Sequence, residues 1–109
     1  MYIIKRTAQF DAWLDSLKDN ITRIRLARRL DKVQRGNLGD TKPVGSGVIE
    51  MREHFGAGWR MYFIQHGDVL IVMLGGGTKS GQSTDIANAI TLAQQLESKL
   101  QELNHDQKN

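Results

Sequence analysis

The spacing of apolar residues along the chain predicts three helices. After Thr7, whose hydroxyl suits a helix cap, apolar side chains recur every three or four residues, at Phe10, Trp13, Leu14 and Leu17. A second helix is expected over 21–35, where the apolar residues share one face and Gly36 follows as a left-handed end residue. A third helix is expected to begin at Ser83 or Thr84, with apolar positions that again step by three and four.

Elsewhere the pattern alternates with a period of two and predicts strands. Residues 48–55 and 59–66 form the two predicted strands of a hairpin, joined by a short loop of two glycines around an alanine. The continuous apolar run at 69–74 is typical of a central strand that is covered on both faces. A short first strand is expected at 2–5, and residues 37–47 form a loop with room for a brief strand.

The resulting order, β-α-α-β-β-β-α, predicts a single α+β domain over residues 1–109, with two N-terminal helices, an antiparallel β-sheet and a C-terminal helix. We expect the helices to gather on one side of the sheet. The chain has no cysteine, which excludes disulfides and thiolate metal sites. Its first residues do not match a signal peptide and no apolar run could cross a bilayer, so a cytoplasmic location and no membrane contact are expected.

The formal net charge is +3, and basic side chains concentrate on the second predicted helix. At about 100° per residue they fall on one stripe, opposite the apolar residues. The stripe consists of Arg25, Arg28, Arg29, Lys32 and Arg35. A cationic helix face is a candidate surface for RNA or another polyanion, although a solvated helix face explains the same pattern.

The polar residues of the predicted hairpin also share one face. With a three-residue loop, His54 lies opposite Arg60 and Arg52 lies opposite Tyr62, and Glu50 joins them. The neighbouring apolar positions face the core, so this set is expected to point away from it. Arginine, histidine and tyrosine side chains on one face suit contacts with phosphates and bases. The alternative is a solvated strand face with a Glu50–Arg52 ion pair.

The glycine-rich segment 75–82 is expected to form a loop between a strand and a helix, where phosphates often bind. It does not match the Walker loop of ATP-binding proteins, because Thr78 precedes Lys79 where that loop requires a glycine. Lys79 is still placed to contact a nucleic-acid phosphate near a helix start. No histidine has the spacing of a metal ligand, so neither a metal nor another cofactor is expected.

Several consecutive blocks share the order and spacing of a known family. In the first half they are Arg29-Leu30, Gly36-Asn37-x-Gly39-Asp40 and Gly47-Val48-x-Glu50-Met51-Arg52. In the second half they are Gly56-x-Gly58-x-Arg60-x-Tyr62-Phe63 and Leu74-Gly75-Gly76-Gly77-x-Lys79-Ser80-x-Gln82-x-x-Asp85-Ile86. These blocks resemble the phage-derived Gp49-like addiction module killer proteins, a branch of the RelE/ParE toxin superfamily close to HigB. The resemblance covers roughly residues 10–93.

The resemblance implies an endoribonuclease that cuts messenger RNA in the ribosomal decoding site and so inhibits translation. In such toxins a 2′-hydroxyl attacks the adjacent phosphate, with cationic side chains in place of a metal. Carried over by motif, Arg52, Arg60 and Lys79 would supply the cations, and His54 or Tyr62 the base. Gln82 joins the basic stripe as a residue that would contact RNA or the ribosome.

The resemblance also implies a partner, a small helix-turn-helix antitoxin of the HigA kind that inhibits the toxin. Operator DNA would be contacted only through that complex. RelE and HigB carry a late tyrosine or histidine as an active-site group, whereas this chain has only His105 near its end. Two other functions stay open: a ParE-like poison of DNA gyrase without ribonuclease activity, and a nucleic-acid-binding module without catalysis.

Overall fold

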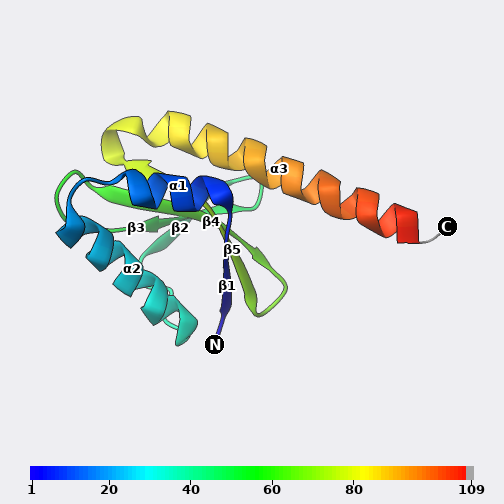
Figure 1. Ribbon diagram of the computed structural model, residues 1–109, viewed down its shortest axis with the longest axis horizontal. Coiled ribbons are helices and arrows are strands. Elements are labelled where there is room, and N and C mark those ends of the chain that lie inside the picture. The colour runs from blue at the N-terminus through cyan, green and yellow to red at the C-terminus, as the bar shows by residue number, and fades with distance from the viewer. Residues whose placement is uncertain (108–109) are drawn as a thin grey trace.

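The computed structural model describes residues 1–107, and within them the side chains of residues 1–102, so the side chain of His105 lies outside the described part. The helices are α1 (Ala8–Ser16), α2 (Asn20–Gln34) and α3 (Gln82–Gln107), and the turn η1 (Lys79–Gly81) precedes α3. The strands are β1 (Ile3–Arg6), β2 (Thr41–Gly45), β3 (Val48–Arg52), β4 (Trp59–His66) and β5 (Leu70–Thr78). The predicted α+β class, with two N-terminal helices and a C-terminal helix, is confirmed (Figure 1).

The strands form one five-stranded sheet in the order β1-β5-β4-β3-β2. Strands β2 to β5 are antiparallel neighbours, as the hairpin signals predict, but β1 pairs with β5 in parallel, so the sheet is mixed. The parallel pairing ends where Arg6 meets Met73. Beyond that point β5 has β4 as its only strand neighbour within the described residues.

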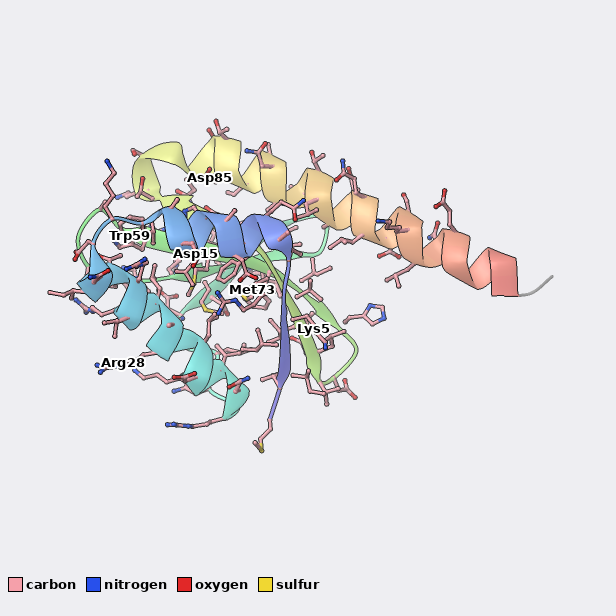
Figure 2. All side chains as sticks on the ribbon, in the orientation of Figure 1. Lys5, Asp15, Arg28, Trp59, Met73 and Asp85 are labelled. Atoms are coloured by element: carbon pink, nitrogen blue, oxygen red, sulfur yellow. The ribbon has the colours of Figure 1, made fainter. Side chains whose placement is uncertain are left out.

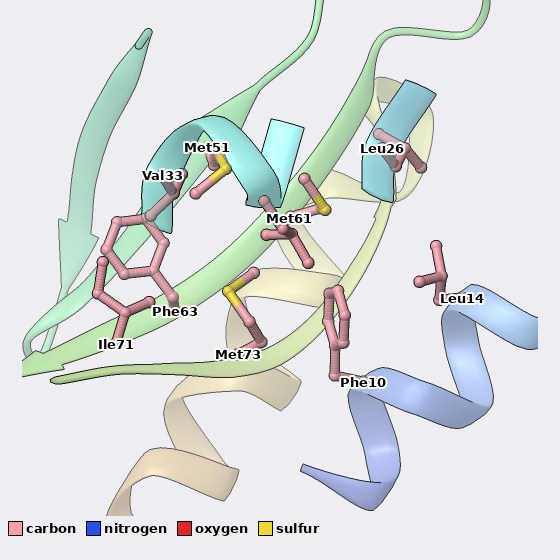
Figure 3. Packing of buried hydrophobic residues seen from close by; sticks show 10 residues of the cluster. Phe10, Leu14, Leu26, Val33, Met51, Met61, Phe63, Ile71 and Met73 are labelled. Carbon is pink, nitrogen blue, oxygen red and sulfur yellow. The ribbon is translucent and has the colours of Figure 1, made fainter. Parts of the chain in front are cut away.

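The helices cover both faces of the sheet, and the expectation that they gather on one side is wrong. Helices α1 and α2 pack on one face over the main core, which Figure 3 shows in close-up. That core contains Phe10, Leu14, Leu26, Leu30, Val33, Met51, Met61, Phe63, Ile71 and Met73. The first half of α3 packs on the other face against Val48, Tyr62 and Leu74, and its C-terminal half extends past the sheet (Figure 1). Helices therefore cover the central strands of the sheet on both faces.

Local signals mark the helix ends, Thr7 and Gly36 as expected and Asp19 as a cap that was not predicted. The hydroxyl of Thr7 accepts a hydrogen bond from the backbone N–H of Phe10 at 3.1 Å and caps α1. Asp19 does the same for α2 by accepting from the N–H of Ile21 at 3.1 Å. Gly36 follows α2 with a φ of +98°, a conformation that favours glycine.

The first half of the glycine-rich segment, residues 75–78, is strand, and the prediction of a loop is wrong there. Gly75, Gly76 and Gly77 belong to β5 beyond a register shift at Leu74, and neighbouring glycines face opposite sides of the sheet because strand positions alternate. A Cβ atom on Gly76 would collide with the ring of Trp13 from α1, and a Cβ on Gly77 would collide with the carboxyl group of Asp85 from α3. Two of these glycines therefore let helices on both sides of the sheet approach its backbone.

Within residues 1–107, no helix combines the length and the apolar character that crossing a membrane requires.

Candidate functional site

A row of charged residues crosses one end of the sheet. Arg52 and Arg60 are direct partners across β3 and β4, and Arg60 is the partner of Gly77 on β5. On the other side of β3, the backbone N–H of Arg52 donates to the carbonyl of Asp40 at 3.0 Å. The predicted register, with Arg52 opposite Tyr62, is wrong by two residues because the hairpin loop is longer than three residues. A shift of two keeps each side chain on its face, so the predicted set stays together.

Arg52 and His54 meet at one carboxylate. Nη2 of Arg52 donates to Oδ1 of Asp40 at 2.9 Å, and Nε2 of His54 lies 2.6 Å from Oδ2. The hydrogen bond from Arg52, followed by that from His54, lowers the pKa of Asp40 to about 2. The same contact with Asp40 raises the pKa of the Arg52 guanidinium. Arg52 therefore pairs with Asp40 and not with Glu50, the partner that the solvated-face alternative required.

Arg29 of α2 fixes the backbone at this end of the sheet. Its guanidinium donates to the carbonyls of Leu38 at 2.9 Å, Asp40 at 3.1 Å and Arg52 at 3.0 Å, and to the Glu53 carboxylate at 2.8 Å. The residue is only 8% exposed. The expectation that Arg29 points outward with the basic stripe is therefore wrong, because its side chain is buried and its donors tie α2 to two loops.

Three other members of the predicted outward face are buried under α3. Glu50 and Tyr62 are 0% exposed, and Arg60 is 7% exposed. The Tyr62 hydroxyl donates to Oε2 of Glu50 at 3.2 Å, and Nε2 of Gln82 donates to the same oxygen at 2.6 Å. Burial and the Glu50 charge raise the pKa of Tyr62. The expectation that this face points to solvent fails for these residues, because the start of α3 lies over them.

Arg60 is the least satisfied charge of this cluster. Its Nε lies 3.8 Å from Oε1 of Glu50, and its buried Nε and Nη1 have no hydrogen-bond partner in the described part of the chain. A buried guanidinium usually uses its donors. The residue is therefore a cation with spare hydrogen-bonding capacity, although little of it reaches the surface.

Lys79 joins the same end of the molecule through the hairpin loop. The backbone N–H of Lys79 donates to the carbonyl of Ala57 at 3.3 Å. A Cβ atom added to Gly58 would lie 3.1 Å from the Cβ of Lys79. Its side chain is exposed. Lys79 thus lies beside the loop that carries His54. Gln82, three residues later, is engaged by Glu50 and fixes the start of α3, which does not fit its predicted role as an RNA contact.

The remaining members of the basic stripe are exposed on α2. Arg28, Lys32 and Arg35 face solvent, and Figure 2 shows Arg28 pointing away from the molecule. The guanidinium of Arg25 lies 3.7 Å from the ring centre of Phe55, over the hairpin loop. This stacking makes the exposed stripe continuous with the loop next to His54.

Sequence reasoning missed Asp40 and Asp85 as members of the site. Asp40 lies in a block with two glycines, and that block alone could not show that its carboxylate meets Arg52 and His54. Asp85 lies in the first turns of α3 (Figure 2), and its carboxyl group lies against Gly77 of β5. Burial raises the pKa of this carboxyl group. Within the described residues, no group of three metal-binding side chains comes together.

Comparison with known proteins places the chain in a family. Residues 12–98 match the family described as phage derived protein Gp49-like (DUF891). The chain belongs to this Gp49-like family. The family is one of RelE/HigB-like toxins, which confirms the resemblance at that level. The chain is also 42% identical over 93 residues to an uncharacterized protein of Haemophilus influenzae, covering 85% of this chain and 94% of that protein. No solved structure matches.

Proposed function

We propose that this protein is the toxin of a type II toxin–antitoxin system and an endoribonuclease that cleaves messenger RNA on the ribosome. The observation that carries the proposal is the placement of Arg52, Arg60, Lys79 and His54 at the same end of the sheet. Cations that are fixed before the reaction stabilise the negative charge that develops on a phosphate in the transition state. Membership of a family of RelE/HigB-like toxins supports the same reaction.

The two arginines serve different parts of this proposal. Arg52 is partly exposed and held by Asp40, so it is available to an RNA phosphate at the surface. Arg60 lies behind it with unpaired donors in the described part of the chain and contributes positive potential from within the fold. Lys79 adds an exposed cation from the neighbouring turn.

The exposed stripe on α2 supports a second element of the proposal, contact with RNA or the ribosome. Arg25, Arg28, Lys32 and Arg35 present their charges on one side of the molecule, and the contact between Arg25 and Phe55 links them to the candidate site. Contacts between such side chains and the phosphate backbone of RNA supply affinity without reading the base sequence.

The proposal includes a helix-turn-helix antitoxin that binds and silences the toxin, with operator DNA contacted only through the complex. A ribonuclease that acts on its own cell's messenger RNA requires such an inhibitor. Co-expression of the chain with the product of any helix-turn-helix gene found next to its own, followed by co-purification, tests this part. A stable complex and restored growth are expected, and growth arrest that persists beside such a protein would contradict it.

Primer extension on messenger RNA from cells that express the chain tests the activity. We expect new 5′ ends within coding regions soon after induction, together with growth arrest. Double-strand breaks in DNA that depend on gyrase, without RNA cuts, would favour the ParE-like alternative. Neither RNA cuts nor DNA breaks at demonstrated levels of folded protein would leave the non-catalytic binding module.

A further inference from the structure

His54 lies at the open end of the sheet with one ring nitrogen engaged. Its Nε2 is 2.6 Å from Oδ2 of Asp40, and its side chain is 70% exposed. Among residues 1–102 the structure gives the other nitrogen, Nδ1, no hydrogen-bond partner. The position therefore combines a ring held at one nitrogen with an exposed side chain, which a proton acceptor for an incoming substrate requires.

The state of Asp40 determines which nitrogen carries the proton. Because the pKa of Asp40 is held at about 2, first by Arg52 and then by His54, the carboxylate is ionised at neutral pH and only accepts hydrogen bonds. Nε2 of His54 therefore donates to it. In a neutral imidazole this leaves Nδ1 as the acceptor, on a side chain that is 70% exposed.

Asp40 itself is held in place independently of His54. Nη2 of Arg29 donates to its backbone carbonyl at 3.1 Å, and Nη2 of Arg52 donates to Oδ1 at 2.9 Å. The preceding residue, Gly39, has a φ of +68°, and a Cβ there would lie 2.7 Å from the Arg29 guanidinium. Glycine at this position lets the loop pack directly on Arg29, so the carboxylate stays in place when His54 changes.

We propose that Asp40 is a positioning residue that orients His54 as the general base of RNA cleavage; the inference rests on the proposed ribonuclease function. Nδ1 of His54 takes the proton of a 2′-hydroxyl, and the 2′-oxygen forms a bond to the adjacent phosphorus. The bond between that phosphorus and the 5′-oxygen of the next nucleotide breaks. Water protonates the leaving oxygen and becomes hydroxide, and His54 returns its proton to that hydroxide, which leaves a 2′,3′-cyclic phosphate and a 5′-hydroxyl.

The other candidate base does not fit this role. Tyr62 is 0% exposed, its hydroxyl donates to Glu50 at 3.2 Å, and burial raises its pKa. Such a hydroxyl neither meets an RNA strand on the surface nor gives up its proton readily. Of the two residues that the family resemblance left open, His54 is the one that a substrate can reach.

The test is the rate of messenger RNA cleavage on purified ribosomes at saturating protein, for the wild type, His54→Ala, Asp40→Asn and the double variant. Loss of a general base is expected to lower the rate by roughly 100-fold or more. Loss of the orienting carboxylate is expected to lower it by about tenfold or more, with little change in half-saturating protein concentration. The double variant should be no slower than His54→Ala, and free imidazole should partly restore the activity of His54→Ala.

Each result decides between the alternatives. If the two effects multiply in the double variant, Asp40 acts through Arg52 or the loop, and the inference is overturned. Wild-type cleavage by His54→Ala overturns it as well, and this variant stays informative even if Asp40→Asn does not fold, because His54 is mostly exposed. Asp15→Asn, an exposed carboxylate on α1, is the control and should cleave normally. A folded wild type that cleaves nothing overturns the proposed function itself.

Discussion

The guanidinium of Arg29 and the backbone carbonyl of Asp40 lie 3.1 Å apart, and this hydrogen bond joins α2 to the loop that leads into β2. On the far side of the same residue, the Asp40 carboxylate binds Arg52 and His54. Asp40 thus makes a structural contact through its backbone and a contact with the candidate site through its side chain. Changes at Arg29 should consequently affect the fold, whereas changes at His54 should affect the reaction.

Replacing Arg29 with Met should destabilise the protein strongly. The change removes four hydrogen bonds from a guanidinium that is 8% exposed and leaves Glu53 without its partner. Breaking a buried ion pair by removing one partner typically costs about 3–5 kcal/mol. Urea denaturation measures the decrease. Arg28→Met, the neighbouring exposed arginine, is the control and should change stability by no more than about 0.5 kcal/mol. Equal decreases in both variants would contradict the buried role of Arg29.

The Asp40 network should make stability depend on pH in the acid range. The pKa of Asp40 is about 2 in the folded protein against an ordinary value of 3.8, so the ionised form is favoured by folding. Its stabilising contribution is present above pH 3.8 and is lost as the pH falls from 3.8 toward 2. Thermal melting of the wild type and Asp40→Asn should therefore differ at pH 6 and converge near pH 2. A gap that is the same at both pH values would refute this origin.

Single alanine substitutions at the three adjacent glycines of β5 should differ in their effect on stability. Gly76→Ala and Gly77→Ala force a methyl group into Trp13 and Asp85 respectively, and overpacking of this kind typically costs about 1–3 kcal/mol. A Cβ on Gly75 meets nothing within 4 Å, so Gly75→Ala should be neutral or stabilise by up to roughly 1 kcal/mol. Chemical denaturation of the three variants checks the order. If Gly75→Ala is as damaging as the others, strand propensity and not close approach explains the glycines.

The exposed stripe on α2 should contribute to ribosome binding through its charge. Replacing Arg28, Lys32 and Arg35 with alanine should weaken binding and flatten its dependence on salt, because fewer counterions are released. The slope of log affinity against log salt should fall by roughly 0.7–0.9 for each phosphate that the variant no longer neutralises. Lys18→Ala and Lys99→Ala, exposed lysines outside α2, form the control. An unchanged slope in the triple variant would mean that the stripe is only a solvated face.

Much of the fold follows from the sequence because helix and strand periods are local properties. Strand β4 begins and ends at Trp59 and His66 as predicted, since alternation and the flanking glycines mark both ends. The face shared by the polar residues is predicted correctly despite the error in register, because a shift of two residues preserves sides. Which face α3 covers did not follow, since the alternation of a strand does not tell whether a second layer buries its polar side.

The sequence predicted part of the candidate site, including Arg52 and His54, but not Asp40 and not which side chains are buried. Arg29 shares the angular position of the basic stripe, yet the helical period also groups it with Leu26, Leu30 and Val33, which are buried. Its position beside these apolar residues on the helix was the feature of the sequence from which its burial could have been predicted. The glycines of β5 predict a loop because their intrinsic preference opposes a strand. Close packing against Trp13, far along the chain, and against Asp85 on α3 favours the strand instead.

The chemistry of the cut ends tests the central claim most directly. Purified protein is incubated with ribosomes carrying messenger RNA, and the new ends are mapped before and after treatment with polynucleotide kinase. Attack by the 2′-hydroxyl predicts 5′-hydroxyl ends that can be ligated only after the kinase step, cuts that disappear in Lys79→Ala and Arg52→Ala, and normal cuts with Lys99→Ala. Absence of cuts by the folded wild type, or ends that already carry a 5′-phosphate, would contradict the account.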